Sequence, residues 1–228
     1  LKGQKIAEYG TATYPVSFEY NAFGEMVKLF TYRNPNAVIV TNPDPADGDQ
    51  TTWIYDESSG LLASKTYADN KTVTYTYDVK GQLLTRTWAR TNGVAPLVTS
   101  YAYNIYGELL TVTYSDGTTP NVTNTYNAMG MLLATTDVSG ENGRTYNTYR
   151  EIATEANAVL GTALAIGRDN YGRETSSVLT QGESTLATTA TLYNNNSGRI
   201  TRGTFGTNQF NYTYLANSHL ISQVTTCG

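Results

Sequence analysis

The stretch Tyr103-Asn104-Ile105-Tyr106-Gly107-Glu108-Leu109 decides the fold, because its pattern returns along most of the chain. In this pattern a tyrosine is followed by Asn or Asp, a short linker, a glycine and an aliphatic residue two places after the glycine. The pattern also begins at Tyr20, Tyr77 and Tyr126, and with one more linker residue at Tyr55 and Tyr193. A period of about 20 to 50 residues marks a supersecondary unit that is stabilised by stacking on its neighbours. The chain is therefore a repeat array.

Two further copies of the motif are degenerate. Around Gly172, Arg168 stands in the tyrosine position and Glu174 in the aliphatic position, and in the copy that begins at Tyr214, His219 stands in the glycine position. Tyr149 marks a degenerate unit near residues 144–168. We expect a single array of about eight or nine units over residues 1–228. The positions that we assign to the structural repeat motif are Tyr20, Gly24, Tyr55, Gly60, Tyr77, Gly81, Tyr103, Gly107, Tyr126, Gly130, Gly172, Tyr193, Gly198 and Tyr214.

Between the motifs, the residues alternate as in a β-strand. Thr72-Val73-Thr74-Tyr75-Thr76-Tyr77 places one valine and two tyrosines on one face and three threonines on the other. Asp116-Gly117 and Asn92-Gly93 favour tight hairpin turns, and each motif glycine favours a second turn with positive φ. These patterns predict an all-β fold, an array of consecutive antiparallel β-hairpins that forms a continuous twisted or spiralling sheet.

The apolar residues of the repeat fall into two sets. The residue two places before the motif tyrosine is aromatic in five copies, and we expect these side chains to stack across adjacent strands: Phe18, Trp53, Tyr75, Tyr101 and Tyr212. We also expect the motif tyrosines to be largely buried together with the aliphatic residues Met26, Leu62, Leu83, Leu109, Leu132, Ile200 and Ile221.

Two segments interrupt the period. Residues 34–50 contain Pro35, Pro43 and Pro45, and because proline cannot donate to a strand ladder we expect a loop outside the sheet. Residues 150–166 are rich in alanine and fit either a worn hairpin or a short helix. The neighbouring repeats favour the hairpin, because the sheet has to continue through this region.

Composition and charge argue against several classes of function. The formal net charge is −4, and Lys and Arg occur singly, so no basic stripe is present to neutralise phosphates and we expect no nucleic-acid partner. No apolar run has the length of a membrane span, and we expect no membrane insertion. The N-terminal Leu1-Lys2-Gly3-Gln4 has neither a starting Met nor a signal-peptide core, which indicates a segment of a longer protein or a processed product.

Residues with catalytic or ligand-binding chemistry are sparse. His219 is the only histidine, and no nucleophile motif, cysteine cluster or phosphate-binding loop occurs, so we expect no enzyme, no cofactor and no metal site. Asp44, Asp47 and Asp49 could bind a hard cation, but their spacing is not that of an EF-hand, and a solvated acidic loop is the favoured interpretation. Cys227, the only cysteine, is either a free thiol or an intermolecular contact.

The tyrosine content leaves a binding function open. Tyrosine occurs 19 times, and rows of tyrosines amid Thr and Asn could stack on sugar rings, as in a carbohydrate-binding adhesin. The same residues pack equally well within a sheet, which is the favoured interpretation. Asn70, Asn121, Asn195 and Asn211 begin N-glycosylation sequons, but such triplets also arise by chance in Asn-rich turns.

The pattern Tyr-Asp/Asn-x-x-Gly, followed by Asp-Gly and a further tyrosine-containing strand, closely resembles the YD repeat of the Rhs family. This repeat is also found in the toxin-enclosing C components of insecticidal Tc complexes and in teneurins. The resemblance implies a spiral strip of β-hairpins that, in full-length members, closes into a hollow shell around a toxic polypeptide. It also implies a non-catalytic structural module of a secreted or cell-surface bacterial protein, which acts as an extracellular scaffold, fibre or shell-wall segment.

The outer strands suggest a kind of partner. The segments Tyr14 to Tyr20 and Phe210 to Tyr214 are aromatic alternating strands without a polar cap. Unpaired strand edges template pairing with another chain. We therefore expect them to pair with further repeats of the same longer chain or with identical subunits, a head-to-tail contact that builds a filament when it does not close.

Overall fold

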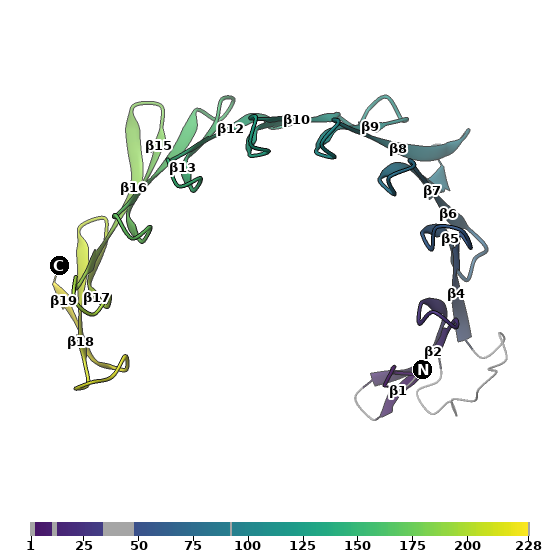
Figure 1. Ribbon diagram of the computed structural model, residues 1–228, viewed down its shortest axis with the longest axis horizontal. Coiled ribbons are helices and arrows are strands. Elements are labelled where there is room, and N and C mark those ends of the chain that lie inside the picture. Colours follow the sequence, from purple (N-terminus) through teal and green to yellow (C-terminus); the bar gives the residue numbers. More distant parts are fainter. Residues whose placement is uncertain (1–2, 11–12, 34–47, 92, 228) are drawn as a thin grey trace. The chain divides into compact units, whose positions relative to one another are not determined.

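The computed structural model describes residues 3–10, 13–33, 48–91 and 93–227, which contain 19 β-strands (Figure 1). No helix occurs in this described part of the chain, and so none there is long and apolar enough to cross a membrane. The chain forms two compact units, Leu1–Pro120 and Asn121–Gly228.

The first unit is an antiparallel meander. Its strands are β1 (Ala7–Gly10), β2 (Thr13–Tyr20), β3 (Met26–Tyr32), β4 (Gly48–Tyr55), β5 (Leu62–Thr66), β6 (Thr72–Tyr77), β7 (Leu83–Thr91), β8 (Pro96–Tyr103) and β9 (Leu109–Tyr114). Each strand pairs with the next one along the chain, from β1 with β2 to β8 with β9. The contacts of this unit are therefore local in sequence.

The second unit has the same topology. Its strands are β10 (Val122–Tyr126), β11 (Leu132–Asp137), β12 (Gly140–Tyr146), β13 (Ile152–Asn157), β14 (Thr162–Arg168), β15 (Glu174–Gln181), β16 (Ser184–Tyr193), β17 (Ile200–Phe205), β18 (Asn208–Tyr214) and β19 (Ile221–Cys227). Consecutive strands again pair antiparallel. The predicted all-β array of antiparallel hairpins is confirmed, whereas the single array over all 228 residues stays a prediction.

Two kinds of hairpin turn alternate within each unit. The motif turns join β2 to β3, β4 to β5, β6 to β7 and β8 to β9, and they curl to the same side of the strip of strands in Figure 1. In the second unit they join β10 to β11, β12 to β13, β14 to β15, β16 to β17 and β18 to β19. The turns between β5 and β6, β11 and β12, β13 and β14, β15 and β16, and β17 and β18 lie at the opposite ends of the strands.

Each motif hairpin contains a β-bulge at the motif tyrosine. In the first such hairpin Glu19 lies opposite Lys28 but Tyr20 lies opposite Met26, so that Val27 is one additional residue on β3. The register shifts in the same way at Tyr55, Tyr77, Tyr103, Tyr126, Tyr146, Arg168, Tyr193 and Tyr214. A bulge increases the local twist and reorients the adjacent backbone, so it belongs to the repeat itself.

The two faces of the sheet differ as the alternation predicts. On β6, Val73 is buried while Thr74 and Thr76 on the other face are exposed. Threonines of neighbouring strands bond to each other across the second face, as Thr76 Oγ1 and Thr85 Oγ1 do at 2.6 Å. The same pairing of hydroxyls occurs between Thr66 and Thr72, Thr145 and Thr154, and Ser177 and Thr189.

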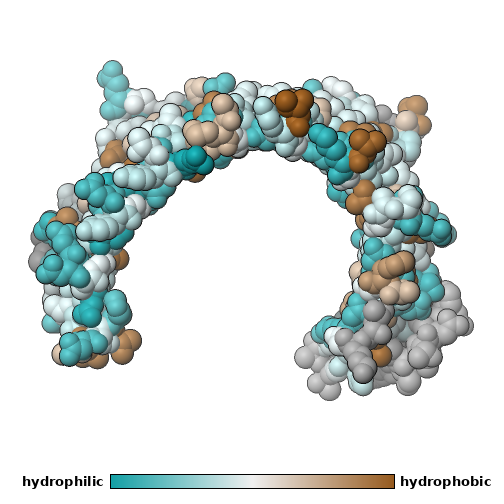
Figure 2. All heavy atoms as spheres, in the orientation of Figure 1, coloured by the Kyte–Doolittle hydropathy of each residue, from teal (hydrophilic) through white to brown (hydrophobic). Residues whose placement is uncertain are grey.

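The predicted burial of the motif residues is wrong at Ile200 and Ile221. The motif tyrosines are half-buried, as are Met26, Leu62, Leu83, Leu109 and Leu132, while Ile200 and Ile221 are exposed. The reason is that each unit is one layer of strands, and no second layer packs on it among the described residues. Figure 2 accordingly shows apolar residues as separate groups of brown spheres among hydrophilic ones.

The two interruptions of the period have different outcomes. Residues 150–166 contain β13 and the start of β14, so the hairpin interpretation is correct and the short helix is wrong. Of the predicted loop 34–50, residues 34–47 lie outside the described residues, but Gly48, Asp49 and Gln50 begin β4. They belong to the sheet because Gly48 pairs with Tyr32 and continues the ladder between β3 and β4.

Candidate functional site

The side chain of an Asn or Asp residue closes the motif turns, except the last one, which has Leu215 at this position. In the turn between β8 and β9, Asn104 Oδ1 accepts hydrogen bonds from the backbone N–H groups of Tyr106 at 2.9 Å and Glu108 at 3.0 Å. The backbone closes the same loop, since Asn104 N donates to Glu108 O and Gly107 N donates to Asn104 O. Asn21, Asp78, Asn127, Asn147 and Asp169 accept the same two side-chain bonds. These Asp and Asn side chains therefore bond to the backbone of their own turns.

The glycine of the motif is required by its backbone angle. Gly81 has φ 81° and Gly107 has φ 89°, in the left-handed region that residues with a Cβ disfavour, and this confirms the predicted positive φ. The residue after one motif glycine also covers the next motif glycine. Gln82 Nε2 donates to Gly107 O at 3.2 Å, and a Cβ on Gly107 would lie 2.9 Å from that nitrogen. Neighbouring motif turns therefore stack on each other.

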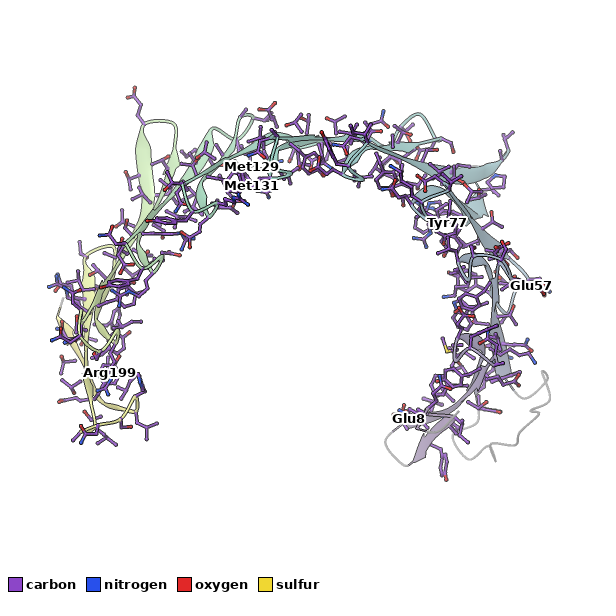
Figure 3. The ribbon with its side chains drawn as sticks, viewed as in Figure 1. Glu8, Glu57, Tyr77, Met129, Met131 and Arg199 are labelled. Carbon is purple, nitrogen blue, oxygen red and sulfur yellow. The ribbon has the colours of Figure 1, made fainter. Side chains whose placement is uncertain are left out.

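In six repeats the motif tyrosine bonds to the preceding repeat. The hydroxyl of Tyr77, which Figure 3 labels, donates to the backbone carbonyl of Leu62 at 3.0 Å, and Leu62 is the aliphatic residue of the preceding motif. The same bond runs from Tyr55 to Met26, from Tyr103 to Leu83, from Tyr146 to Leu132, from Tyr193 to Glu174 and from Tyr214 to Ile200, at 2.7 to 3.1 Å. Burial raises the pKa of Tyr77, with a smaller contribution from Tyr75, so this hydroxyl stays a proton donor.

Aromatic and cationic side chains alternate across the face that carries the motif tyrosines. Lys65 on β5 lies over the Trp53 ring of β4, with Nζ 5.1 Å from the ring centroid. Arg86 on β7 lies over the Tyr75 ring of β6, at 5.9 Å from the centroid. The predicted stacking of aromatic residues on adjacent strands is therefore wrong in this part of the sheet, because the aromatic residues occupy alternate strands and a cation lies between them.

The linkers of the motif turns carry exposed apolar side chains. Phe23 is 89% exposed, and Val79, Ile105 and Tyr106 are exposed at the same two linker positions of other turns in the first unit. In the second unit Met129, Tyr149 and Tyr171 hold the second of these positions. A single exposed apolar residue is ordinary, but its return at one place of the repeat puts a row of contact groups on the motif turns of each unit.

One motif lies within the predicted degenerate unit near residues 144–168, but it begins three residues before Tyr149, the residue predicted to mark the unit. Tyr146-Asn147-Thr148-Tyr149-Arg150-Glu151-Ile152 forms a full motif turn, in which Arg150 occupies the glycine position with φ 68°. The Tyr-Asn pair and the Glu-Ile pair are the sequence signals that identify it. The sequence pattern did not predict this motif because arginine is not expected in the glycine position, where a residue with a Cβ has an unfavourable positive φ.

The last motif turn also differs from the prediction. Asn217, with φ 56°, takes the left-handed position in the turn between β18 and β19, and His219 lies two residues later as an exposed side chain. His219 is therefore not in the glycine position. Asparagine tolerates this conformation better than other residues with a Cβ, which explains its use here.

The other candidate residues come together in no catalytic or metal-binding arrangement that the structure describes. No group of three or more potential ligands occurs among the described His, Cys, Asp and Glu side chains. Asp49 forms an ion pair with Arg33, whereas Asp44 and Asp47 lie outside the described residues. Cys227 ends β19, opposite Gln209, but its side chain lies outside the described part, so its predicted intermolecular contact stays a prediction.

Comparison with known proteins identifies the repeat. Residues 55–92, from the end of β4 to the residue after β7, match the family described as RHS Repeat. No curated protein matches the sequence. A chain of the Photorhabdus luminescens Tc holotoxin pore has the same fold, with a TM-score of 0.61 and 15% identity over 93% of this chain and 12% of that chain.

A chain of the TcdB2–TccC3–Cdc42 crystal structure is a further match, with a TM-score of 0.47 and 15% identity over 98% of this chain and 15% of that chain. The protein described here thus spans a small part of the length of these solved chains. Residues 55–92 therefore match an RHS repeat, and the fold of the chain is similar to that of the solved Tc chain.

Proposed function

We propose that the chain is a non-catalytic wall segment of a larger secreted or cell-surface shell of the Rhs and Tc type. In such a wall each repeat serves to position the next one, and the enclosed partner is a toxin polypeptide. In an extracellular scaffold or fibre the segment would have the same structural role, but the assembly would enclose no polypeptide. No step of chemistry is required of the segment itself.

The link from each motif tyrosine to the preceding repeat is the observation that carries this proposal. The hydroxyl of Tyr103 reaches the carbonyl of Leu83 at 3.0 Å, and that of Tyr77 reaches Leu62 at the same distance, so the repeats are held at fixed intervals. A wall of constant spacing needs such a repeated joint, whereas an enzyme needs convergent polar groups in a cleft. The fold shared with a chain of the Tc holotoxin pore supports the same role.

The exposed linker residues provide the contact surface of this wall. Phe23, Val79 and Ile105 project from three of the four motif turns of the first unit, where an enclosed polypeptide or another wall segment would meet them. Charged residues are sparse at 15% of the chain, so such contacts would be made through apolar and neutral polar groups.

Hydrogen exchange and sedimentation test the proposal together. In a wall segment, the amides on the free sides of β1 and β19 exchange rapidly in dilute solution and become protected as the protein concentration rises and the chain associates. Expression of the complete gene product, with any sequence that flanks these 228 residues, then shows whether the same amides are protected within one longer chain. Rapid exchange at both edges in the complete product and at high concentration would contradict the wall function.

A further inference from the structure

A groove of about 790 Å³ lies in the first unit, at the strand ends opposite the motif turns. Its walls come from the ends of β3 and β7, the start of β4 and the turn between β5 and β6. The side chains that matter for its chemistry are Arg33, Asp49, Tyr67, Asp69, Lys71 and Arg90. None of them takes part in the motif turns or in the tyrosine links, so the repeat architecture does not account for this combination.

Two of the cations at the groove are neutralised by carboxylates. Arg33 pairs with Asp49 across β3 and β4, and Lys71 Nζ lies 2.8 Å from Asp69 Oδ2. Arg33 binds both oxygens of Asp49, and Lys71 binds both oxygens of Asp69 through its Nζ and its backbone N–H. These bonds hold the two carboxylates in place, and each oxygen keeps a second lone pair with which it can accept another bond. The groove therefore presents two ordered acceptor groups to a ligand.

Two other cations have no carboxylate partner among the described residues. Arg90 is exposed, and its guanidinium lies 5.2 Å from the centroid of the Trp88 ring. Lys65 does not line the groove itself but lies over the ring of its lining residue Tyr67, with Nζ 4.7 Å from the centroid. On a chain with a net charge of −4, the groove thus has a local excess of positive charge. Such an excess attracts an anionic ligand, and an unpaired arginine is suited to bind its acidic group in a bidentate manner.

The third component of the groove is the aromatic side chain of Tyr67. Its half-buried side chain lines the groove, and an aromatic ring of this kind packs against the apolar face of a sugar. A saccharide also supplies hydroxyl groups that donate to the carboxylates of Asp49 and Asp69. An acidic peptide offers few such donors and would place its own charges against these carboxylates.

We propose that this groove binds an acidic saccharide, with its carboxylate on Arg90, a sugar ring against Tyr67 and sugar hydroxyls donating to Asp49 and Asp69. The site is independent of the wall function proposed above, because it uses no motif-turn residue. It would give the first unit a means of attachment to an acidic polysaccharide at a cell surface.

Calorimetric titration of the full chain with trigalacturonate tests this proposal. We expect binding at low salt that weakens as the ionic strength rises, since the charges are exposed. We expect Arg90→Gln to weaken it at least about tenfold, which is the loss of about 1.4 kcal/mol of a charge-assisted contact. Tyr67→Ala should weaken it comparably, while Arg202→Gln in the second unit, the matched control, leaves the affinity unchanged. All variants should keep the strand signal in circular dichroism.

The ligand series separates the saccharide from other anions. The uncharged methyl ester of the same trisaccharide should bind at least about tenfold more weakly than the acid. Tetraglutamate should bind more weakly than trigalacturonate. Absence of trigalacturonate binding, equal binding of the methyl ester, equal binding of tetraglutamate, or an equal loss in Arg202→Gln would each overturn the proposal.

Discussion

Replacing Arg150 by glycine should stabilise the second unit. Arg150 has φ 68° at the position where the neighbouring motif has Gly172 with φ 76°, and its exposed side chain forms no ion pair among the described residues. The left-handed conformation costs a residue with a Cβ about 1–2 kcal/mol. Glycine loses about 0.5–1 kcal/mol more backbone entropy on folding. The expected net gain is therefore about 0.5–1 kcal/mol, measured as a higher midpoint in urea unfolding at an unchanged slope.

Arg150→Ala is the matched control for this prediction. It removes the same side chain but keeps the Cβ, so the backbone strain remains and the midpoint should stay within about 0.5 kcal/mol of the parent chain. The urea midpoint of Arg150→Gly therefore has to exceed that of Arg150→Ala. If Arg150→Gly and Arg150→Ala unfold at the same urea concentration, the strain at this position is not what limits stability, and the reasoning from φ is refuted.

Three further predictions follow from the motif turns. Tyr77→Phe removes the hydroxyl bond to the preceding repeat and should lower the free energy of unfolding by about 1 kcal/mol, whereas Tyr75→Phe, whose hydroxyl has no such bond, should not. Gly107→Ala should cost about 1–2 kcal/mol, and Gln82→Ala in the same chain should recover part of it, because the new Cβ meets the glutamine side chain. Hydrogen bonds from Ser58 and Ser59 lower the pKa of Asp56 from 3.8 to about 2, so its contribution to stability is present above the unfolded pKa and is lost as the pH falls toward 2. Acid titration of Asp56→Asn should lack this part of the pH dependence.

The sequence predicts the hairpins well because their signals are local. The alternation of Thr72 to Tyr77 fixes which side chains share a face, and the glycines fix where the chain turns with positive φ. The same signals misplace one motif and one turn position, because Arg150 and Asn217 adopt positive φ without being glycine. A search for glycine alone cannot find such positions. The Tyr-Asn pair at Tyr146 and Asn147 identifies the first of them.

Contacts between repeats could not be predicted from the sequence in the same way. The acceptor of the Tyr77 hydroxyl is the backbone carbonyl of Leu62. Every residue has such a carbonyl, so the residue type at this position does not reveal the bond. The degree of burial was overestimated for a related reason. Alternating apolar residues indicate a face of a sheet, but they do not say whether a second layer covers it, and Ile221 remains 52% exposed.

Within the motif, backbone groups and side chains have separate roles, and this explains how two chains that are 15% identical can share one fold. The tyrosine bond needs a carbonyl and not a particular side chain, so Glu174 serves as acceptor where other repeats have Leu or Met. The glycine position accepts Arg150 or Asn217 at a modest cost, and the turn at Leu215 is closed by its backbone, since Leu215 N donates to Leu220 O. Because each joint consists of several weak bonds between adjacent repeats, the loss of one bond costs about 1 kcal/mol and leaves the other bonds of the joint in place. Selection can then act on the spacing of the repeats while most side chains change.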